Sequence, residues 1–303
     1  MSRHEARPEA AGLQAALERT TRSALASGAL KPVETEQLLV EDAGVGFLVR
    51  VVSSLRRKEA DRHARAVRGA VQDRPANPFL PPEPELTVAD LGPAHVAVLN
   101  KFNVLDNHLL VVTRSFEHQE TLLTPADFSA LFACMSEIQG LAFYNGGTMA
   151  GASQTHKHLQ LVPLPLVAHG PAVPMEALLR GEGTDCAGVP FAHAFARLSA
   201  AIPSEPLAAA EQAYGLYLDL LTQLGGKVSG GKAGPRQPFP YNLLIADGWM
   251  LIVPRVAELY RGISVNALGF AGSLFVKDRR QLELVRAAGP MQVLTAVAGR
   301  SQG

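Results

Sequence analysis

Reactive side chains gather in one segment of the chain, residues 153–160. Alternate residues of a β-strand share a face, so His156, His158 and Gln160 are expected to project together. A neutral imidazole is a good nucleophile towards phosphorus near neutral pH, because its reference pKa is about 6.5. A glutamine amide can donate a hydrogen bond to a phosphoryl oxygen without exchanging a proton. The pattern therefore predicts phosphoryl chemistry on one face of a strand.

Two other interpretations of these histidines stay open at the level of the residues alone. An edge strand would carry them into solvent without a chemical role. Two histidines at i and i+2 can also chelate zinc, but such a site needs a third ligand, and only His108 is a plausible one. The two cysteines, Cys134 and Cys186, have no paired spacing, so we expect neither a disulfide scaffold nor a cysteine-based zinc site.

The segments around the reactive one have the periodicities of an α+β protein. Helical spacing predicts helices over 12–30, over 207–224, and from Pro125, after an N-cap at Thr124, to the glycines near 145–147. β-rich runs predict strands over 45–52 and 155–162, and two hairpins, within 95–114 around a short turn at 105–107 and within 241–255 around an Asp-Gly turn. Hairpins mixed with helices, without regular β-α-β units, indicate an antiparallel sheet rather than a doubly wound parallel one.

The order of these elements indicates three regions. They are an N-terminal region over 1–170 that carries the reactive strand, a connecting segment over 171–205, and a C-terminal region over 206–303 that packs on the same core. The segments FNVLDNHLLVVTR and YNLLIADGWMLIVPR share an order of aromatic-Asn, apolar strand, turn, apolar strand and Arg. A degenerate duplication would explain this likeness. The order of strand, turn and strand that all hairpins share would also explain it.

Composition limits the classes of function. The chain has 28 Lys and Arg against 28 Asp and Glu, and binding to nucleic acid or anionic membrane depends on a basic excess, so we expect neither as a partner. The start, MSRHEARPEA, has charges and Pro where a secretory signal needs an apolar core, and no apolar run is long enough for a membrane helix. The stretch 225–234 fails the P-loop pattern, because Val228 and Ala233 stand where Ser or Thr should follow Lys. We therefore expect a cytoplasmic protein.

The stretch AFYNGGTMAGASQTHKHLQLVPL resembles the active-site segment of the diadenosine tetraphosphate phosphorylases, also called ATP adenylyltransferases, a branch of the histidine-triad superfamily. In this branch, as in the galactose-1-phosphate uridylyltransferases, glutamine replaces the third histidine of the motif, here Gln160. The resemblance covers about residues 45–290 and extends to NPFLPPEP, to LNKFNVLDNHLLVVTR, and to PYNLLIADGWMLIVPR followed by ISVNALGFAGSLFVKD. It implies a histidine-triad-like antiparallel sheet with flanking helices. One departure is Thr155, where we expect Pro before the first histidine.

The activity that the resemblance implies is phosphorolysis of diadenosine tetraphosphate by inorganic phosphate to ATP and ADP, and the reverse reaction, through an adenylyl-histidine intermediate. By motif position His158 is the nucleophile, His156 orders it, and Gln160 binds the transferring phosphoryl group. Gln160 also favours transfer over hydrolysis, because a hydrolase must activate water whereas phosphate is already a nucleophile. The alternatives are a histidine-triad nucleotide hydrolase, which Gln160 disfavours, and a nucleotide-sensing protein without turnover, which would not need a nucleophile.

Further residues match the family's substrate-binding positions. They are Asn145, Gly151, Ala152, Ser153 and Gln154 in and before a glycine-containing loop, Lys58, Asn100 and Lys101 in the N-terminal region, and Asn266, Gly272 and Lys277 near the C-terminus. The backbone amides of the loop suit anions, because glycines allow close approach. We expect a divalent cation, Mg²⁺, to accompany the polyphosphate, without a dedicated protein cage. A basic cluster over 56–74 is either an attractor for a polyanion or a charged helix face.

Overall fold

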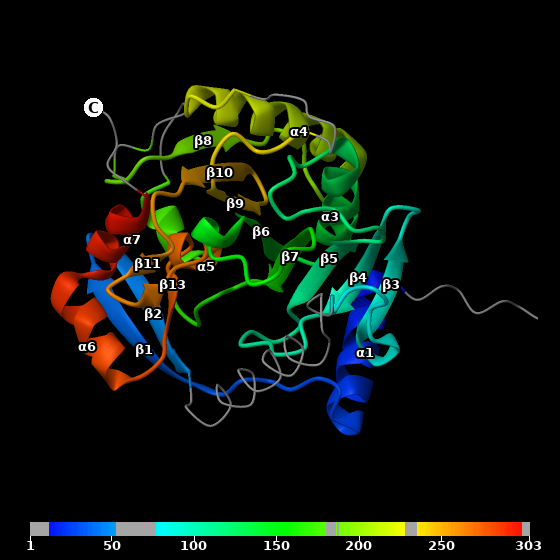
Figure 1. The fold of residues 1–303 in the computed structure, drawn as a ribbon, viewed down its shortest axis with the longest axis horizontal. Helices are drawn as coiled ribbons and strands as arrows, with labels where there is room; N and C mark the ends of the chain where they lie inside the picture. Colours follow the sequence, from blue (N-terminus) through cyan, green and yellow to red (C-terminus); the bar gives the residue numbers. More distant parts are fainter. Residues whose placement is uncertain (1–11, 53–76, 180–185, 187, 228–234, 299–303) are drawn as a thin grey trace, which may run out of the picture.

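An eight-stranded antiparallel sheet forms the centre of the molecule (Figure 1). The computed structural model describes residues 12–52, 77–179, 186, 188–227 and 235–298 of the chain. Every neighbouring pair of strands in this sheet is antiparallel, so the predicted α+β fold is confirmed. In spatial order the strands are β3 (Thr87–Leu91), β4 (His95–Leu99), β5 (Leu109–Thr113), β7 (His158–Pro163), β6 (Gly140–Gly146), β9 (Tyr241–Ala246), β10 (Trp249–Pro254) and β8 (Ala194–Arg197).

Helices cover one face of this sheet. α3 (Pro125–Glu137) and α4 (Pro206–Gln223) pack against each other, and α1 (Leu13–Ser27) packs beside β3. Their apolar side chains form a first hydrophobic core with one set of sheet residues, such as Ile245. The neighbouring Leu244 belongs to a second core on the opposite face, because successive strand residues point to opposite sides.

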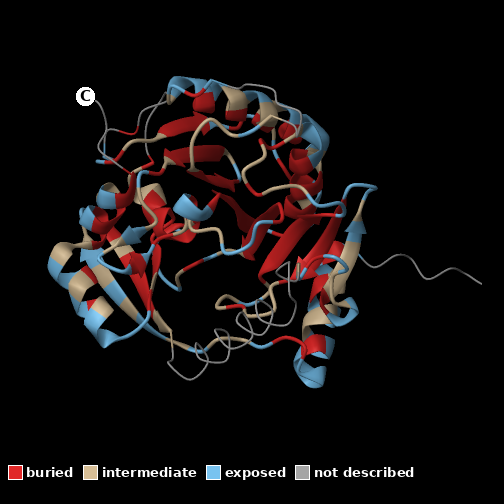
Figure 2. Ribbon diagram, viewed as in Figure 1, coloured by how far each residue is buried: buried red, intermediate tan, exposed pale blue. Residues whose placement is uncertain are grey.

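A smaller sheet and the C-terminal helices cover the other face. β1 (Thr35–Asp42) pairs antiparallel with β2 (Val45–Val52), and β13 (Ser273–Val276) pairs parallel with β2. The remaining elements of this layer are β11 (Leu259–Tyr260), β12 (Ile263–Ser264), α5 (Ala267–Phe270), α6 (Arg279–Ala288) and α7 (Pro290–Ala298). Figure 2 shows most strands of the large sheet buried between the two layers, whereas the edge strand β3 is only partly buried and residues on the outer sides of α1 and α6 are exposed.

The helix after Thr124 is shorter than the sequence pattern predicted. Thr124 caps it as expected, but the helix ends at Glu137, not near 145–147, and the following residues form strand β6. A Cβ atom at Gly140 would lie only 2.6 Å from the main-chain oxygen of Val162, so this strand packs closely against β7. Pairing of β6 with β7 and β9 thus overrides the local helical period.

The first predicted hairpin has a longer connection than expected. β4 and β5 are joined by a loop over 100–108, not by a short turn at 105–107. Main-chain oxygens of this loop, at Lys101 and Asn103, accept hydrogen bonds from the segment 31–33. The loop is therefore held by the segment 31–33 as well as by its own closing hydrogen bond from Asn100 N to His108 O, and it is not equivalent to strand β9. The second hairpin, β9 and β10 around the Asp-Gly turn, is confirmed.

Edge strands gave the weakest sequence signal. Helices α1 and α4 and strand β2 lie where the sequence predicted them, whereas β1, β3 and β8 were not predicted. Each of these three strands lies at the edge of its sheet, and β8 lies within the segment 171–205 that was expected to be connecting structure. In the described part of the chain, no helix is long and apolar enough to cross a membrane.

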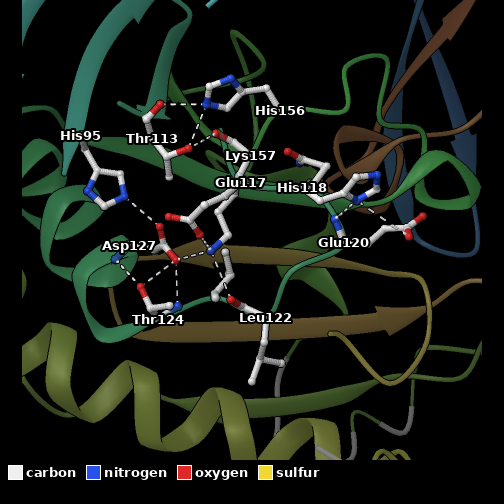
Figure 3. Close-up of polar contacts among 12 residues, drawn as sticks. His95, Thr113, Glu117, His118, Glu120, Leu122, Thr124, Asp127, His156 and Lys157 are labelled. Atoms are coloured by element: carbon white, nitrogen blue, oxygen red, sulfur yellow. Dashed lines mark hydrogen bonds and ion pairs between the residues drawn. The ribbon is translucent and has the colours of Figure 1, made fainter. Parts of the chain in front are cut away.

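Strand β7 begins beside a buried ionic cluster, on the face away from His158. Lys157 is fully buried, and its Nζ atom lies 2.9 Å from Asp127 Oδ2 and 2.8 Å from Glu117 Oε2 (Figure 3). The other oxygen of Asp127 lies 2.7 Å from His95 Nε2. Burial alone would raise the pKa of Asp127, but the hydrogen bond with His95 and the charge of Lys157 lower it to about 2. The cluster ties the start of β7 to β4 and α3.

Removing the negative charge from this cluster should destabilise the fold. In Asp127→Asn the partly exposed Glu117 is the one counter-ion that the described residues leave to the Lys157 ammonium, and breaking a buried pair typically costs about 3–5 kcal/mol. We expect a decrease of this size in the free energy of unfolding in urea. The control Asp90→Asn removes an exposed ion pair with Arg114 and should change that free energy by less than about 1 kcal/mol. Equally small changes in both variants would contradict this role for the cluster.

Candidate active site

His158, the first residue of β7, is held through one ring nitrogen, and no described residue engages the other. Its Nδ1 atom lies 2.8 Å from the main-chain oxygen of His156. A carbonyl oxygen only accepts, so Nδ1 carries the proton and Nε2 carries the lone pair. Burial lowers the pKa of His158 to about 4, so the ring is neutral near neutral pH. This is the protonation state that a nucleophilic imidazole needs.

The ring of His156 is fixed by two neighbours. Its Nε2 atom lies 2.8 Å from Thr113 O and 2.9 Å from Thr113 Oγ1. Because the carbonyl oxygen accepts, Nε2 carries the proton, and Nδ1 accepts a hydrogen bond from Asn77 Nδ2 at 2.8 Å. Both ring nitrogens are thus engaged within the protein. The hydrogen bond that links His156 to His158 uses the main-chain oxygen of His156.

The backbone of His158 is held by Gln119, a residue that sequence reasoning missed. Gln119 Oε1 accepts a hydrogen bond from His158 N at 2.9 Å, and its Nε2 donates to Asn145 O at 2.9 Å. The side chain bridges β6 and β7 beyond their last paired residues. Asn145 uses its own side chain within the protein, because its Oδ1 accepts from Asn242 Nδ2 and Ala267 N.

Two phenylalanines lie against the histidine rings. The centroid of the buried Phe79 ring lies 5.4 Å from that of His158 and 5.6 Å from that of His156. Phe116 is half exposed, and its ring centroid lies 5.5 Å from that of His156. These apolar contacts exclude water from the rings, and this desolvation lowers the pKa of both histidines.

The surroundings of Gln160 bear on the interpretations that the sequence left open. Gln160 Oε1 lies 3.0 Å from His108 Nε2, and His108 Nδ1 lies 3.1 Å from Asn100 Nδ2. Both ring nitrogens of His108 therefore have protein partners, which leaves neither for a zinc ion. Within the described ranges, no three His, Cys, Asp or Glu side chains gather around a metal position. β7 lies between β5 and β6, so the interpretation as an edge strand with solvated histidines is wrong.

The glycine-containing loop 147–154 joins β6 to β7 and touches the C-terminal part of the chain. Gly147 and Gly151 have φ values of +89° and +88°, a left-handed backbone that favours glycine. A Cβ atom at Gly151 would lie 3.0 Å from Asn266 Cα, so the loop packs closely against the turn before α5. Asn266 caps α5, and its Oδ1 accepts from Leu268 N at 3.1 Å.

Four predicted substrate-binding residues lie next to the histidines in the chain or in space. Ala152, Ser153 and Gln154 belong to the stretch that leads into His156, and the side chains of the last two are exposed. Asn100 contacts His108, the partner of Gln160. The fold therefore brings together the histidines, Gln160, the end of the glycine-containing loop and Asn100 from the loop between β4 and β5.

The remaining predicted residues have other surroundings. Lys101 Nζ lies 2.7 Å from Glu83 Oε1 in an ion pair. A Cβ atom at Gly272 would come within 2.6 Å of the Pro174 side chain, so this glycine permits close packing of the backbone. Lys277 is exposed after β13. Outside the described residues lie Lys58 and the basic cluster over 56–74.

Sequence reasoning missed the role of the residues that hold the histidines and Gln160. These residues are Asn77, Thr113, Gln119 and His108. Thr113 is the last residue of β5, and His108 directly precedes that strand. Because β5 pairs with β7, a prediction of this strand pairing would have placed Thr113 and His108 beside the site. Asn77 belongs to the stretch NPFLPPEP, which the sequence marked only as a whole.

Comparisons with known proteins assign this arrangement to a family. The family model for the Ap4A phosphorylase N-terminal domain matches residues 3–181, and that for the ATP adenylyltransferase C-terminal domain matches residues 187–300. The chain belongs to the Ap4A phosphorylase family. It is 30% identical to diadenosine 5',5'''-P1,P4-tetraphosphate phosphorylase 2 of Saccharomyces cerevisiae over 68% of this chain and 70% of that protein. It is 27% identical to Protein APA1 of the same yeast over 85% of this chain and 84% of that protein.

Solved structures agree with the family assignment. The crystal structure of yeast Ap4A phosphorylase Apa2 superposes on this one with a TM-score of 0.76 at 25% identity, over 95% of this chain and 97% of that chain. The structure of Apa2 in complex with Ap4A gives a TM-score of 0.75 at 23% identity over the same shares, 95% and 97%. The family and the fold that the sequence motif implied are therefore confirmed.

The buried histidines should stay neutral well below the pH at which free histidine titrates. Burial lowers the pKa of His108 and His158 to about 4, against about 6.5 for an unperturbed ring. NMR titration of ¹⁵N-labelled protein should therefore find both rings neutral at about pH 5.5. Because the unfolded chain binds these protons first, the free energy of unfolding should fall as the pH drops below about 6.5.

In that titration the variant His158→Gln identifies the ring resonance of His158, because this resonance is absent from the spectrum of the variant. A midpoint near 6.5 for either ring would contradict the burial described above.

Proposed function

We propose that this protein catalyses the phosphorolysis of diadenosine tetraphosphate by inorganic phosphate to ATP and ADP, and the reverse reaction. The observation that carries the proposal is the neutral ring of His158, whose Nδ1–H is bonded to His156 O and whose Nε2 is engaged by no described residue. Gln160 places an amide two residues further along the same strand face. Membership of the Ap4A phosphorylase family supports the choice of substrate.

The first step transfers an adenylyl group to His158. Its Nε2 attacks the α-phosphorus of one adenosine, and the bond from that phosphorus to the bridging oxygen breaks. ATP leaves with the electrons of that bond, and AMP remains attached to the ring through a P–N bond. The ring becomes positively charged in this step, and the hydrogen bond from Nδ1 to His156 O stabilises that charge.

The second step transfers the adenylyl group to phosphate. An oxygen of inorganic phosphate attacks the same phosphorus, the P–N bond breaks, and His158 recovers its lone pair as ADP forms. Phosphate is already a nucleophile, whereas water must lose a proton to a general base, and Gln160 cannot accept one. We therefore propose that the glutamine at this position favours phosphorolysis over hydrolysis.

Both steps need hydrogen-bond donors for the phosphoryl oxygens. We assign this role to the amide of Gln160 and to the backbone N–H groups of the loop 147–154, whose glycines allow close approach. Among the predicted substrate-binding residues, Asn100, Ser153 and Gln154 have positions that support contact with the nucleotide. A donor fixed in advance stabilises developing charge without reorganising during the reaction.

We propose that Mg²⁺ enters with the polyphosphate, as part of the substrate. The donor set supports this view, because the described residues offer no group of three metal-ligating side chains. Mg²⁺ commonly binds phosphate oxygens and keeps several waters, so it needs few protein ligands. The ion would offset part of the negative charge of the polyphosphate.

Product analysis tests the proposal. Purified protein is incubated with diadenosine tetraphosphate and Mg²⁺, with and without phosphate, and the products are separated by ion-exchange chromatography. We expect ATP plus ADP only when phosphate is present, and a decrease of at least about 10³-fold in His158→Ala, because the nucleophile is lost. The control His169→Ala removes an exposed histidine after β7 and should keep the parent rate.

Other products would contradict the proposal. ATP plus AMP, or two molecules of ADP, formed as fast without phosphate as with it would identify a hydrolase. Tight nucleotide binding without any turnover would identify a sensor.

A further inference from the structure

The amide of Gln160 helps a phosphoryl group only when its nitrogen points at that group. A glutamine side chain carries an acceptor oxygen at one end of the amide and a donor nitrogen at the other, and the two ends have nearly the same shape. A rotation of the amide by half a turn would therefore place a lone pair against the phosphoryl oxygens, where it would repel them. Something in the protein must choose between the two orientations.

A chain of two hydrogen bonds makes this choice. Asn100 Nδ2 can only donate, so His108 Nδ1, 3.1 Å away, must be the acceptor. The single proton of the neutral His108 ring is then on Nε2, 3.0 Å from Gln160 Oε1. Gln160 Oε1 accepts this proton, and the NH2 group of the amide is turned away from His108.

The surroundings of this chain keep it in place. The residues His108 and Gln160 are 7% and 8% exposed, so water competes little for their hydrogen bonds. The ring of His108 packs against Phe143 at a centroid distance of 5.8 Å, and Phe143 lies opposite Gln160 in the pairing of β6 with β7. Asn100 is also bonded to His108 through the backbone, because Asn100 N donates to His108 O at 2.9 Å.

We propose that His108, oriented by Asn100, is a positioning residue that holds the Gln160 amide with its NH2 group towards the transferring phosphoryl group. The inference rests on the proposed function, because it assigns Gln160 a role in that reaction. His108 touches neither substrate nor reacting atoms in this account and acts only through Gln160. The tautomer of His108 is therefore the property that matters, and any group that donates from the position of Nε2 should replace it in part.

A double-mutant cycle tests the proposal. His108→Phe keeps the ring and removes the donor, and His108→Gln restores an amide donor; both are made in the parent protein and in Gln160→Ala. The rate of ATP release from diadenosine tetraphosphate is measured in a single turnover without phosphate. We expect His108→Phe to lower this rate about 10- to 100-fold in the parent, because a misdirected donor forfeits much of its stabilisation. We expect little further loss in Gln160→Ala, and partial recovery in His108→Gln.

The outcomes separate a positioning role from a structural one. Equal losses from His108→Phe in both backgrounds, or no loss in the parent, would overturn the proposal. Thermal unfolding of each variant shows whether the fold is retained, and His169→Phe, at an exposed histidine, is the matched control. Failure of the proposed function would look different, because the parent protein would then release no ATP, as a sensor, or would form free AMP or ADP without phosphate, as a hydrolase.

A spectroscopic test needs neither turnover nor a variant that folds. The ¹⁵N NMR spectrum of a neutral histidine distinguishes a proton on Nε2 from one on Nδ1. We expect the Nε2–H tautomer for His108 and the opposite Nδ1–H tautomer for His158, in the same protein at neutral pH. An Nδ1–H tautomer at His108 would turn the Gln160 amide around and overturn the proposal.

Discussion

The hydrogen bond from His158 Nδ1 to the main-chain oxygen of His156 determines what the site can do. It fixes the tautomer of the ring, and the lone pair on Nε2 follows from it. The bond requires that the backbone of residues 156–158 keep one shape. Thr113 and Asn77 hold the His156 ring, and Gln119 holds the His158 backbone. Residues outside β7 therefore keep this backbone geometry in place.

The start of β7 has polar groups on both faces, and this arrangement fixes its register. A shift of a strand by one residue would exchange its faces, placing Lys157 in the site and the histidines under the helices. The buried ion pair of Lys157 with Asp127 makes such a shift costly, because a charged ammonium would lose its partners. The ionic cluster on one face of β7 therefore also fixes the position of the reactive residues on the other face, because alternate residues of one strand point to opposite sides.

The sequence correctly predicted that His158 and Gln160 share a face of one strand, because the two-residue period of a strand is geometric and needs no knowledge of the rest of the chain. It did not predict β6, whose residues are buried on both faces and carry no alternation. Nor did it show that Asn145 and Asn266 use their side-chain oxygens in packing and capping, because Asn145 contacts residues far away in the chain. The substrate contacts and a cytoplasmic location stay predictions.

Whether His158 carries the adenylyl group decides between this mechanism and its alternatives. The protein is mixed with diadenosine tetraphosphate and Mg²⁺ without phosphate, quenched, and examined by intact-mass spectrometry and peptide mapping. The mechanism predicts one adenylyl group per chain on His158, absent in His158→Ala and released as ADP when phosphate is added. An unmodified enzyme that nevertheless forms ATP and ADP with phosphate, or an adenylyl group on another residue, would contradict it.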